Sequence, residues 1–138
     1  MSQIFKTQIQ IKFHEADPVG IMYFANIFTL AHDSFEVFIQ KAGYTWAQWF
    51  NERKHIFPIR HAECDYLRPF KAGEIYDIEI VVAEFSTSSF KMQYTFKQNG
   101  HDHAIVTMVQ TCLDGATFKK INLLEEVKQK LSPYLKEA

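Results

Sequence analysis

The stretch FANIFTLAHDSFEVFIQKAG, residues 24–43, decides the fold. Its apolar side chains recur at helical spacing, at Ile27, Leu30, Ala31, Phe35, Phe38, Ile39 and Ala42. Phe28 and Val37 extend this apolar surface around the cylinder, and Gly43 stands where a helix C-cap belongs. The pattern therefore predicts a long helix, from about Phe24 to Ala42, that is buried on most of its sides.

Strand patterns lie on both sides of this helix in the sequence. From Phe5 to Phe13 apolar and polar residues alternate, which is typical of a strand with one buried face. Four more strands are expected after the helix, at Ile56–Leu67, Glu74–Glu84, Phe90–Gln98 and His103–Leu113. Pro58 interrupts the first of these four, and the turn signal Asn99-Gly100 joins the last two. The last three strands should form an antiparallel meander.

Two short helices complete the expected elements. Thr45 and Gln48 have the spacing of a capping box, which predicts a helix at Trp46–Glu52. A last amphipathic helix is expected at Leu123–Leu131, with Asn122 as its candidate cap.

One helix that is apolar nearly all round must be enclosed, and five strands with one polar face each can enclose it. An antiparallel sheet that curves around the helix satisfies both requirements. We therefore expect an α+β protein with the hotdog fold, a five-stranded antiparallel sheet wrapped around a long central helix. The 138 residues fit one domain, spanning residues 1–138, because the chain is too short for two independent cores.

The composition narrows the function classes. Lys and Arg number 15 against 16 Asp and Glu, without a block of either sign, so a nucleic acid is not an expected partner. No window reaches the roughly 18 apolar residues of a membrane span. The N-terminal residues alternate instead of forming an apolar secretory segment, which favours a cytoplasmic location. Cys64 and Cys112 are expected to be reduced.

The loop HEADPVGIMYFAN, residues 14–26, carries the candidate chemistry. On local grounds Asp17-Pro18-Val19-Gly20 is a near-ideal type I turn. The whole loop resembles the signature of the 4-hydroxybenzoyl-CoA thioesterase family, with Asp17-Pro18-Val19-Gly20-Ile21 and Asn26 at the matching places. The resemblance extends loosely from Phe5 to Cys112.

This resemblance implies hydrolysis of an acyl-CoA thioester to a carboxylic acid and CoA, without a metal or an organic cofactor. The carboxylate at Asp17 attacks the thioester carbonyl or activates a water molecule, and the sequence leaves both routes open. A backbone amide at the start of the central helix, here that of Phe24, stabilises the oxyanion. Many relatives have a His where this chain has Phe24, so only the backbone of this position can act.

Substrate contacts are assigned to residues in and beyond this loop: Gly20, Tyr23, His32, Pro58, Ser88 and Ser89. Gly20 permits close approach of a ligand. His32 is equally compatible with a core or interface role, and the serines with an ordinary turn. The serine segment contains no arginine, so the candidate cations for the CoA phosphates are Lys91, Arg60 and Arg68. The aromatic residues Trp46, Trp49 and Phe57 are compatible with an aryl pocket or with the core, so the acyl specificity stays open.

The resemblance also implies a dimer whose sheets join edge to edge, with active sites at the subunit interface, and a further pairing into a tetramer. Two other functions remain open: a hotdog dehydratase, which needs a catalytic His near the central helix, and a non-catalytic acyl-CoA binding protein. A Cys64 nucleophile paired with His61 has weak support. No metal site is expected, because His101 and His103 lack a third ligand.

Overall fold

The computed structural model describes residues 2–137. Its helices are η1 (Phe13–Glu15), α1 (Asn26–Lys41), α2 (Trp46–Phe50), α3 (Glu125–Leu131) and η2 (Ser132–Tyr134). Its strands are β1 (Phe5–Gln10), β2 (His55–Ile56), β3 (Ile59–Tyr66), β4 (Ile75–Phe85), β5 (Ser89–Gln98), β6 (His101–Thr111) and β7 (Leu113–Asp114). Among these residues no helix is long and apolar enough to cross a lipid bilayer.

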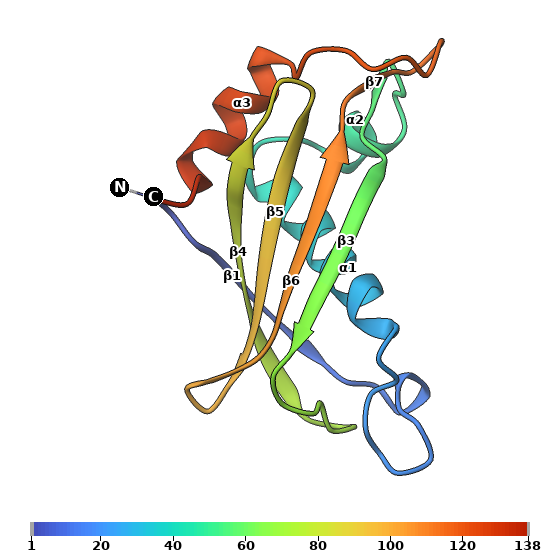
Figure 1. Ribbon diagram of the computed structural model, residues 1–138, viewed down its shortest axis with the longest axis vertical. Coiled ribbons are helices and arrows are strands. Elements are labelled where there is room, and N and C mark those ends of the chain that lie inside the picture. The colour runs from blue at the N-terminus through green and yellow to red at the C-terminus, as the bar shows by residue number, and fades with distance from the viewer. Residues whose placement is uncertain (1, 138) are drawn as a thin grey trace.

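The main sheet has five strands in the order β1-β4-β5-β6-β3, and every neighbouring pair is antiparallel. Figure 1 shows the predicted meander of β4, β5 and β6 at its centre, with β1 and β3 on the two edges. The short strands β2 and β7 pair separately. The predicted fold class is confirmed.

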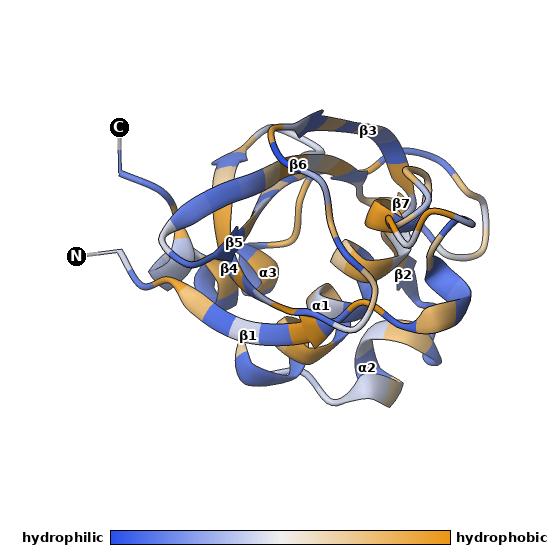
Figure 2. Cartoon of the chain, turned by 90° about the horizontal axis from the view of Figure 1, so that it is seen from below, coloured by the Kyte–Doolittle hydropathy of each residue, from blue (hydrophilic) through white to orange (hydrophobic). Residues whose placement is uncertain are grey.

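The sheet encloses the central helix because one face of each inner strand is apolar. On β5 the buried side chains are Phe90, Met92, Tyr94 and Phe96, as the alternation predicted. They share one core with the buried side chains of α1, among them Phe35, Phe38 and Ile39. Viewed along the strands, the sheet bends around α1 (Figure 2).

Four local predictions are wrong in detail. Val37 is 50% exposed in the single chain, so α1 is open on one side and not buried on most sides. β1 ends at Gln10, and Phe13 starts a 3₁₀ turn with its side chain in solvent. The central helix begins at Asn26 instead of Phe24. The last helix begins at Glu125 with Leu124 as its N-cap, so Asn122 does not cap it.

The boundaries between β2 and β3 confirm the expected interruption at Pro58. α2 carries the predicted capping box, in which the Thr45 hydroxyl accepts from the Gln48 amide. All residues of β3 are exposed except the half-buried Cys64. The edge strand β3 is therefore exposed to solvent on both of its faces.

Candidate active site

The Asp17 loop is a hydrogen-bonded turn. The Gly20 amide donates to the Asp17 carbonyl over 3.0 Å, which closes the predicted turn. The Asp17 carboxylate also serves this turn, because its Oδ1 atom accepts from the amides of Val19 at 2.9 Å and Ile21 at 3.2 Å. Gly20 has φ +81°, a backbone conformation that favours glycine. Within residues 2–137 the other carboxylate oxygen, Oδ2, accepts no hydrogen bond, so it can face a substrate.

Backbone hydrogen bonds fix this turn against the body of the protein. The Met22 amide donates to Phe70 at 2.8 Å, and the Ala72 amide donates to Gly20 at 2.9 Å. On the other side, the Asn26 side-chain amide donates to the Glu15 carbonyl at 2.8 Å. Asn26 is the first residue of α1, so the turn and the start of the central helix are tied together.

Two free amides lie at the start of the helix. Those of Phe24 and Ala25 have no acceptor among the described residues 2–137, whereas the amides of Asn26 and Ile27 donate to the carbonyls of Tyr23 and Phe24. α1 is 16 residues long, and its aligned peptide dipoles place partial positive charge at this end. An anionic oxygen can therefore be stabilised next to the Asp17 turn.

Tyr66, at the end of β3, was not singled out by sequence. Its hydroxyl donates to the Phe24 carbonyl, and burial raises the pKa of Tyr66, so the hydroxyl stays a donor. Tyr66 also lines a pocket of about 330 Å³ beside the turn, with Ile21, Met22, Phe24, Leu67, Arg68, Pro69 and Phe70. This lining is apolar and aromatic apart from one guanidinium group. The Tyr23 and Phe24 rings contact each other at 4.8 Å between centroids, with their planes tilted by 46°, and both residues are more than half exposed.

His32 lies on α1 facing α2. Its Nδ1 atom is 3.5 Å from Glu36, and its ring contacts those of Phe35 and Phe50. The Trp46 indole donates to Glu36 at 3.0 Å, which completes a polar group on this side of the helix. His32 therefore has no described contact with the Asp17 turn in the single chain.

The other predicted substrate contacts lie far from Asp17 in one chain. Ser88 ends the β4–β5 turn and Ser89 begins β5, at the end of the sheet opposite the Asp17 loop (Figure 1). The Ser88 carbonyl accepts from the Cys112 amide at 2.7 Å, and the Pro58 carbonyl accepts from Thr111 at 2.9 Å.

Two of the three candidate phosphate-binding cations lie near these serines. Arg60 and Lys91 line one surface hollow together with Ser86 and Ser89. Arg68, the third candidate, lies at the Asp17 end in the pocket beside Phe24. The single chain therefore divides the predicted site between the two ends of the sheet.

The cysteine alternative is disfavoured by chemistry. Burial raises the pKa of the Cys64 thiol to about 11, so little thiolate exists near neutral pH. His61 pairs with Glu63 at 3.2 Å instead. Residues three apart on a strand point to opposite faces, so His61 and Cys64 are not aligned as a base and a nucleophile. His103, for its part, bonds through Nδ1 to the Pro69 carbonyl at 3.0 Å.

Comparison with known proteins identifies the family. A family model described as the thioesterase-like superfamily matches residues 11–131. The chain belongs to this superfamily. Its sequence is 29% identical to a 1,4-dihydroxy-2-naphthoyl-CoA hydrolase of Synechococcus elongatus, over 89% of this chain and 91% of the relative. It is 25% identical to the enzyme of that name from Nostoc punctiforme, over 93% and 86% of the two chains.

Solved structures of the thioesterase-like superfamily have the same fold. A 1,4-dihydroxy-2-naphthoyl-CoA thioesterase from Synechocystis superposes with a TM-score of 0.84 at 17% identity, covering 94% of this chain and 96% of that one. A DHNA-CoA thioesterase from Staphylococcus aureus gives 0.84 at 20% identity, covering 94% and 89%. The predicted hotdog family and the predicted enzyme class, an acyl-CoA thioesterase, are confirmed.

Proposed function

We propose that this thioesterase-like protein hydrolyses an aromatic acyl-CoA thioester to the aromatic acid and free CoA. The observation that carries the proposal is that two groups belong to the one loop between β1 and α1: the Asp17 carboxylate, whose Oδ2 accepts no hydrogen bond within residues 2–137, and the unpaired Phe24 amide ahead of α1. A thioester carbonyl that accepts from the amide would present its carbon to the carboxylate side.

Hydrolysis of the thioester needs the Asp17 carboxylate, the Phe24 amide and a water molecule. In one route Oδ2 of Asp17 attacks the carbonyl carbon, and the carbon–sulfur bond breaks so that CoA leaves as its thiolate. Water then hydrolyses the mixed anhydride, which restores the Asp17 carboxylate and releases the proton that CoA takes up. In the other, Asp17 takes a proton from water, whose oxygen attacks, and the departing sulfur is protonated to free CoA. In both routes the Phe24 amide and the helix dipole stabilise the negative oxygen of the tetrahedral intermediate.

The aromatic lining of the pocket beside the Asp17 turn supports an aromatic acyl group in the substrate. Phe24, Tyr66 and Phe70 give it ring surfaces, and Arg68 is the single charged side chain in its lining. Flat rings pack well against aromatic side chains, and a guanidinium group stacks on rings or binds oxygen substituents. The relatives named for 1,4-dihydroxy-2-naphthoyl-CoA act on a substrate of this kind.

We further propose that two copies share each site. β3 is a long, exposed edge strand, and such edges are normally paired or protected. If two β3 strands pair antiparallel about a two-fold axis, the start of one strand lies beside the end of the other. Arg60 and Pro58 of the partner subunit then approach Tyr66, which contacts Phe24. The β4–β5 turn of the partner subunit, with Ser88 and Ser89, would bind the CoA arm.

Replacing the carboxylate tests this function. Asp17→Asn keeps an oxygen for the turn amides but removes the nucleophile or base, so we expect kcat to fall by about three orders of magnitude or more while CoA still binds. Asp77→Asn, an exposed change on β4, is the matched control and should retain wild-type turnover. The assay follows thiol release from aromatic, short-chain and long-chain acyl-CoA esters.

Wild-type turnover in Asp17→Asn would contradict the catalytic assignment and favour the view that Asp17 only stabilises its turn. A non-catalytic acyl-CoA binding protein would bind CoA equally well in both variants and hydrolyse nothing. Preference for aliphatic substrates would leave the catalytic assignment standing and overturn the aromatic one.

A further inference from the structure

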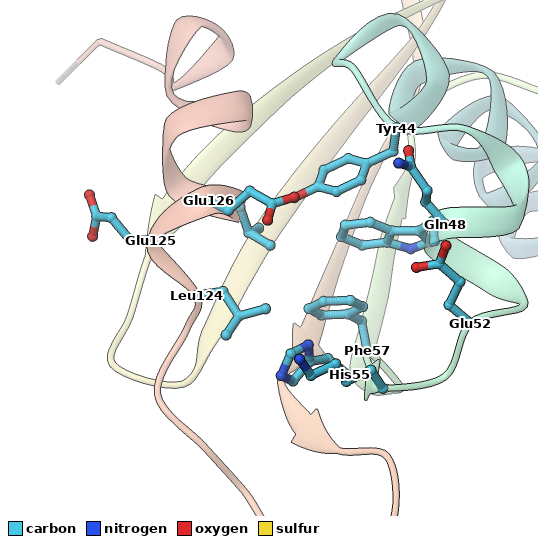
Figure 3. A pocket seen from close by; sticks show the side chains of 11 residues that line it. Tyr44, Gln48, Glu52, His55, Phe57, Leu124, Glu125 and Glu126 are labelled. Carbon is cyan, nitrogen blue, oxygen red and sulfur yellow. The ribbon is translucent and has the colours of Figure 1, made fainter.

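A pocket of about 480 Å³ lies at the end of the sheet opposite Asp17, between α2, the β2 segment and α3 (Figures 1 and 3). Its lining residues come from two separate parts of the chain, residues 44–57 and residues 124–127: Tyr44, Gln48, Trp49, Glu52, Lys54, His55, Phe57, Leu124, Glu125, Glu126 and Val127. The volume is that of a small-molecule site. None of these residues lines the pocket beside Asp17.

Three aromatic rings form one wall of this pocket. The Tyr44 and Trp49 centroids are 5.0 Å apart with the planes at 64°, and Trp49 stacks on Phe57 at 4.2 Å and 11°. Figure 3 shows the rings of Tyr44 and Phe57 on one side of the pocket, with Leu124 opposite them. Aromatic faces carry partial negative charge, so such a wall attracts cations as well as apolar groups.

Acidic groups dominate the charge of the lining. Glu52, Glu125 and Glu126 stand against Lys54, with His55 as a further group that can charge only on protonation. In the part of the chain that the structure describes, neither Glu52 nor Glu125 takes part in an ion pair. Figure 3 shows Glu52 and Glu126 beside the rings and Glu125 directed away from them.

Tyr44 brings a buried hydroxyl group to the side of the pocket next to Glu126. Tyr44 is only 8% exposed, and its hydroxyl oxygen has almost no accessible surface. It is directed toward Glu126 across the pocket (Figure 3), and burial followed by this carboxylate raises the pKa of Tyr44. This hydroxyl therefore interacts with Glu126 and is closed to a bound molecule, so the aromatic rings and the carboxylates define the site.

Lys130 shows that a cation can bind to the Tyr44 ring. The Lys130 ammonium lies 4.2 Å from the centre of the Tyr44 ring and 3.8 Å from Glu126. It also donates to the Gly43 carbonyl at 3.0 Å. An ammonium group is thus already held here by a ring face, a carboxylate and a carbonyl.

The floor of the pocket is held in place before any ligand binds. β2 pairs with β7 through His55 opposite Asp114, and the Gly115 amide donates to Lys54 at 2.9 Å. A Cβ atom on Gly115 would lie 1.7 Å from the Arg53 carbonyl oxygen, so only glycine permits this close approach. A preformed site loses less entropy when a ligand binds.

From these observations we infer that the pocket binds a small organic cation, a quaternary or protonated amine with an apolar body. The methyl or methylene groups of the amine lie against Tyr44, Trp49 and Phe57. Glu52, which forms no ion pair among the described residues, supplies the opposite charge, beside the Glu126 carboxylate that Lys130 already pairs. The site is separate from Asp17, so it is independent of the proposed hydrolysis.

Nuclear magnetic resonance titration with choline tests this inference. We expect choline to shift the Trp49 indole N–H signal and to leave Trp46, whose indole N–H bonds to Glu36 outside this pocket, unshifted as an internal control. The uncharged isostere 3,3-dimethylbutan-1-ol should bind about tenfold more weakly, because it lacks the charge that the rings and carboxylates attract. Glu52→Gln should weaken choline binding more than Glu125→Gln, whose carboxylate is directed away.

Three results would overturn the inference. One is the absence of a choline-dependent Trp49 shift up to tens of millimolar. Another is equal binding of choline and its uncharged isostere, which would make the pocket merely apolar. The third is stronger binding of benzoate than of choline, which would show that Lys54 and His55 outweigh the carboxylates.

Discussion

The Asp17 turn and the pocket between α2 and α3 lie at opposite ends of one sheet, and they differ in completeness. At the Asp17 end the Phe24 amide and one carboxylate oxygen have no partner in residues 2–137, and Tyr23 and Phe24 are 53% and 63% exposed. At the other end, the aromatic wall is already packed and Trp49 is only 7% exposed. We expect the Asp17 region to be completed by the surface of another subunit, whereas the pocket between α2 and α3 is formed entirely by one chain. Substitutions that affect the Asp17 end should therefore change subunit assembly and activity, and substitutions at the other end should change the stability of the folded chain.

Among the substitutions that compare these two regions, the largest effect is expected where the two copies would meet. Ala62 is exposed near the middle of β3, so Ala62→Glu should leave the chain folded but place like charges against each other in the paired strands. We expect the dimer to dissociate and kcat/KM to fall about 100-fold. Sedimentation velocity and thiol release measure the two effects together.

Ala116→Glu is the matched control, since Ala116 is exposed on the loop after β7. It should stay dimeric and active. A monomeric Ala62→Glu protein with full activity would show that each chain holds a complete catalytic site.

The second effect compares one glycine from each region. Gly115→Ala should cost about 3 kcal/mol in the free energy of unfolding, because its methyl group would overlap the Arg53 carbonyl. Gly20→Ala should cost only about 1 kcal/mol, since it meets no atom within 4 Å and pays only for the positive φ. Urea unfolding measures both.

Gly115→Ala should lose more stability, but Gly20→Ala should lose more activity. Gly20→Ala disturbs the turn that presents Asp17, so its kcat at 20 °C should be the lower of the two as long as both remain folded. Equal loss of kcat in both variants would remove the distinction between the two regions.

A smaller effect is expected at Asp114, beside Gly115. The Thr117 amide and hydroxyl hold the pKa of Asp114 below its ordinary value of 3.8. A depressed pKa stabilises the folded state above pH 3.8, and this contribution disappears as the pH falls through the folded-state pKa. Asp114→Ala should therefore lower the urea midpoint at pH 7, and the difference from wild type should shrink toward pH 3. A difference independent of pH would contradict this explanation.

No change in chemistry is expected from Cys64, although it lies on the edge strand. Burial keeps its thiol protonated, with a pKa of about 11, so Cys64→Ser should retain kcat within about threefold. The pH profile of kcat should also keep its shape. Loss of activity with the dimer intact would revive the cysteine nucleophile.

Local patterns in the sequence were sufficient for most of the fold. The helical spacing over residues 24–43 and the alternation of Phe90, Met92, Tyr94 and Phe96 predict the central helix and an inner strand because burial follows these periods. The alternation failed at Phe13, where the chain leaves the sheet before the pattern ends. Sequence periodicity cannot detect such an exit, because it depends on where the chain must turn.

The two regions also differ in how far sequence could predict them. The Asp17 site depends on one continuous loop, so a short motif revealed both the turn and the nearby Phe24 amide. The contact of Tyr66 with the Phe24 carbonyl joins residues 42 apart and has no local signal. The pocket of Tyr44, Trp49 and Phe57 needs α3, some 80 residues later, so the same aromatic residues are equally compatible with a core.

Mixing two inactive variants tests the shared site most directly. Asp17→Asn removes the carboxylate, and Arg60→Glu reverses a charge that the partner subunit is proposed to supply to the CoA arm. If the site is shared, a dissociated and reassociated mixture contains dimers with one intact site, and at low substrate it should regain about a quarter of wild-type activity by random pairing. If the mixture shows only the average of its two inactive parents, each chain uses its own Arg60, and the proposal of a site built from two copies is wrong.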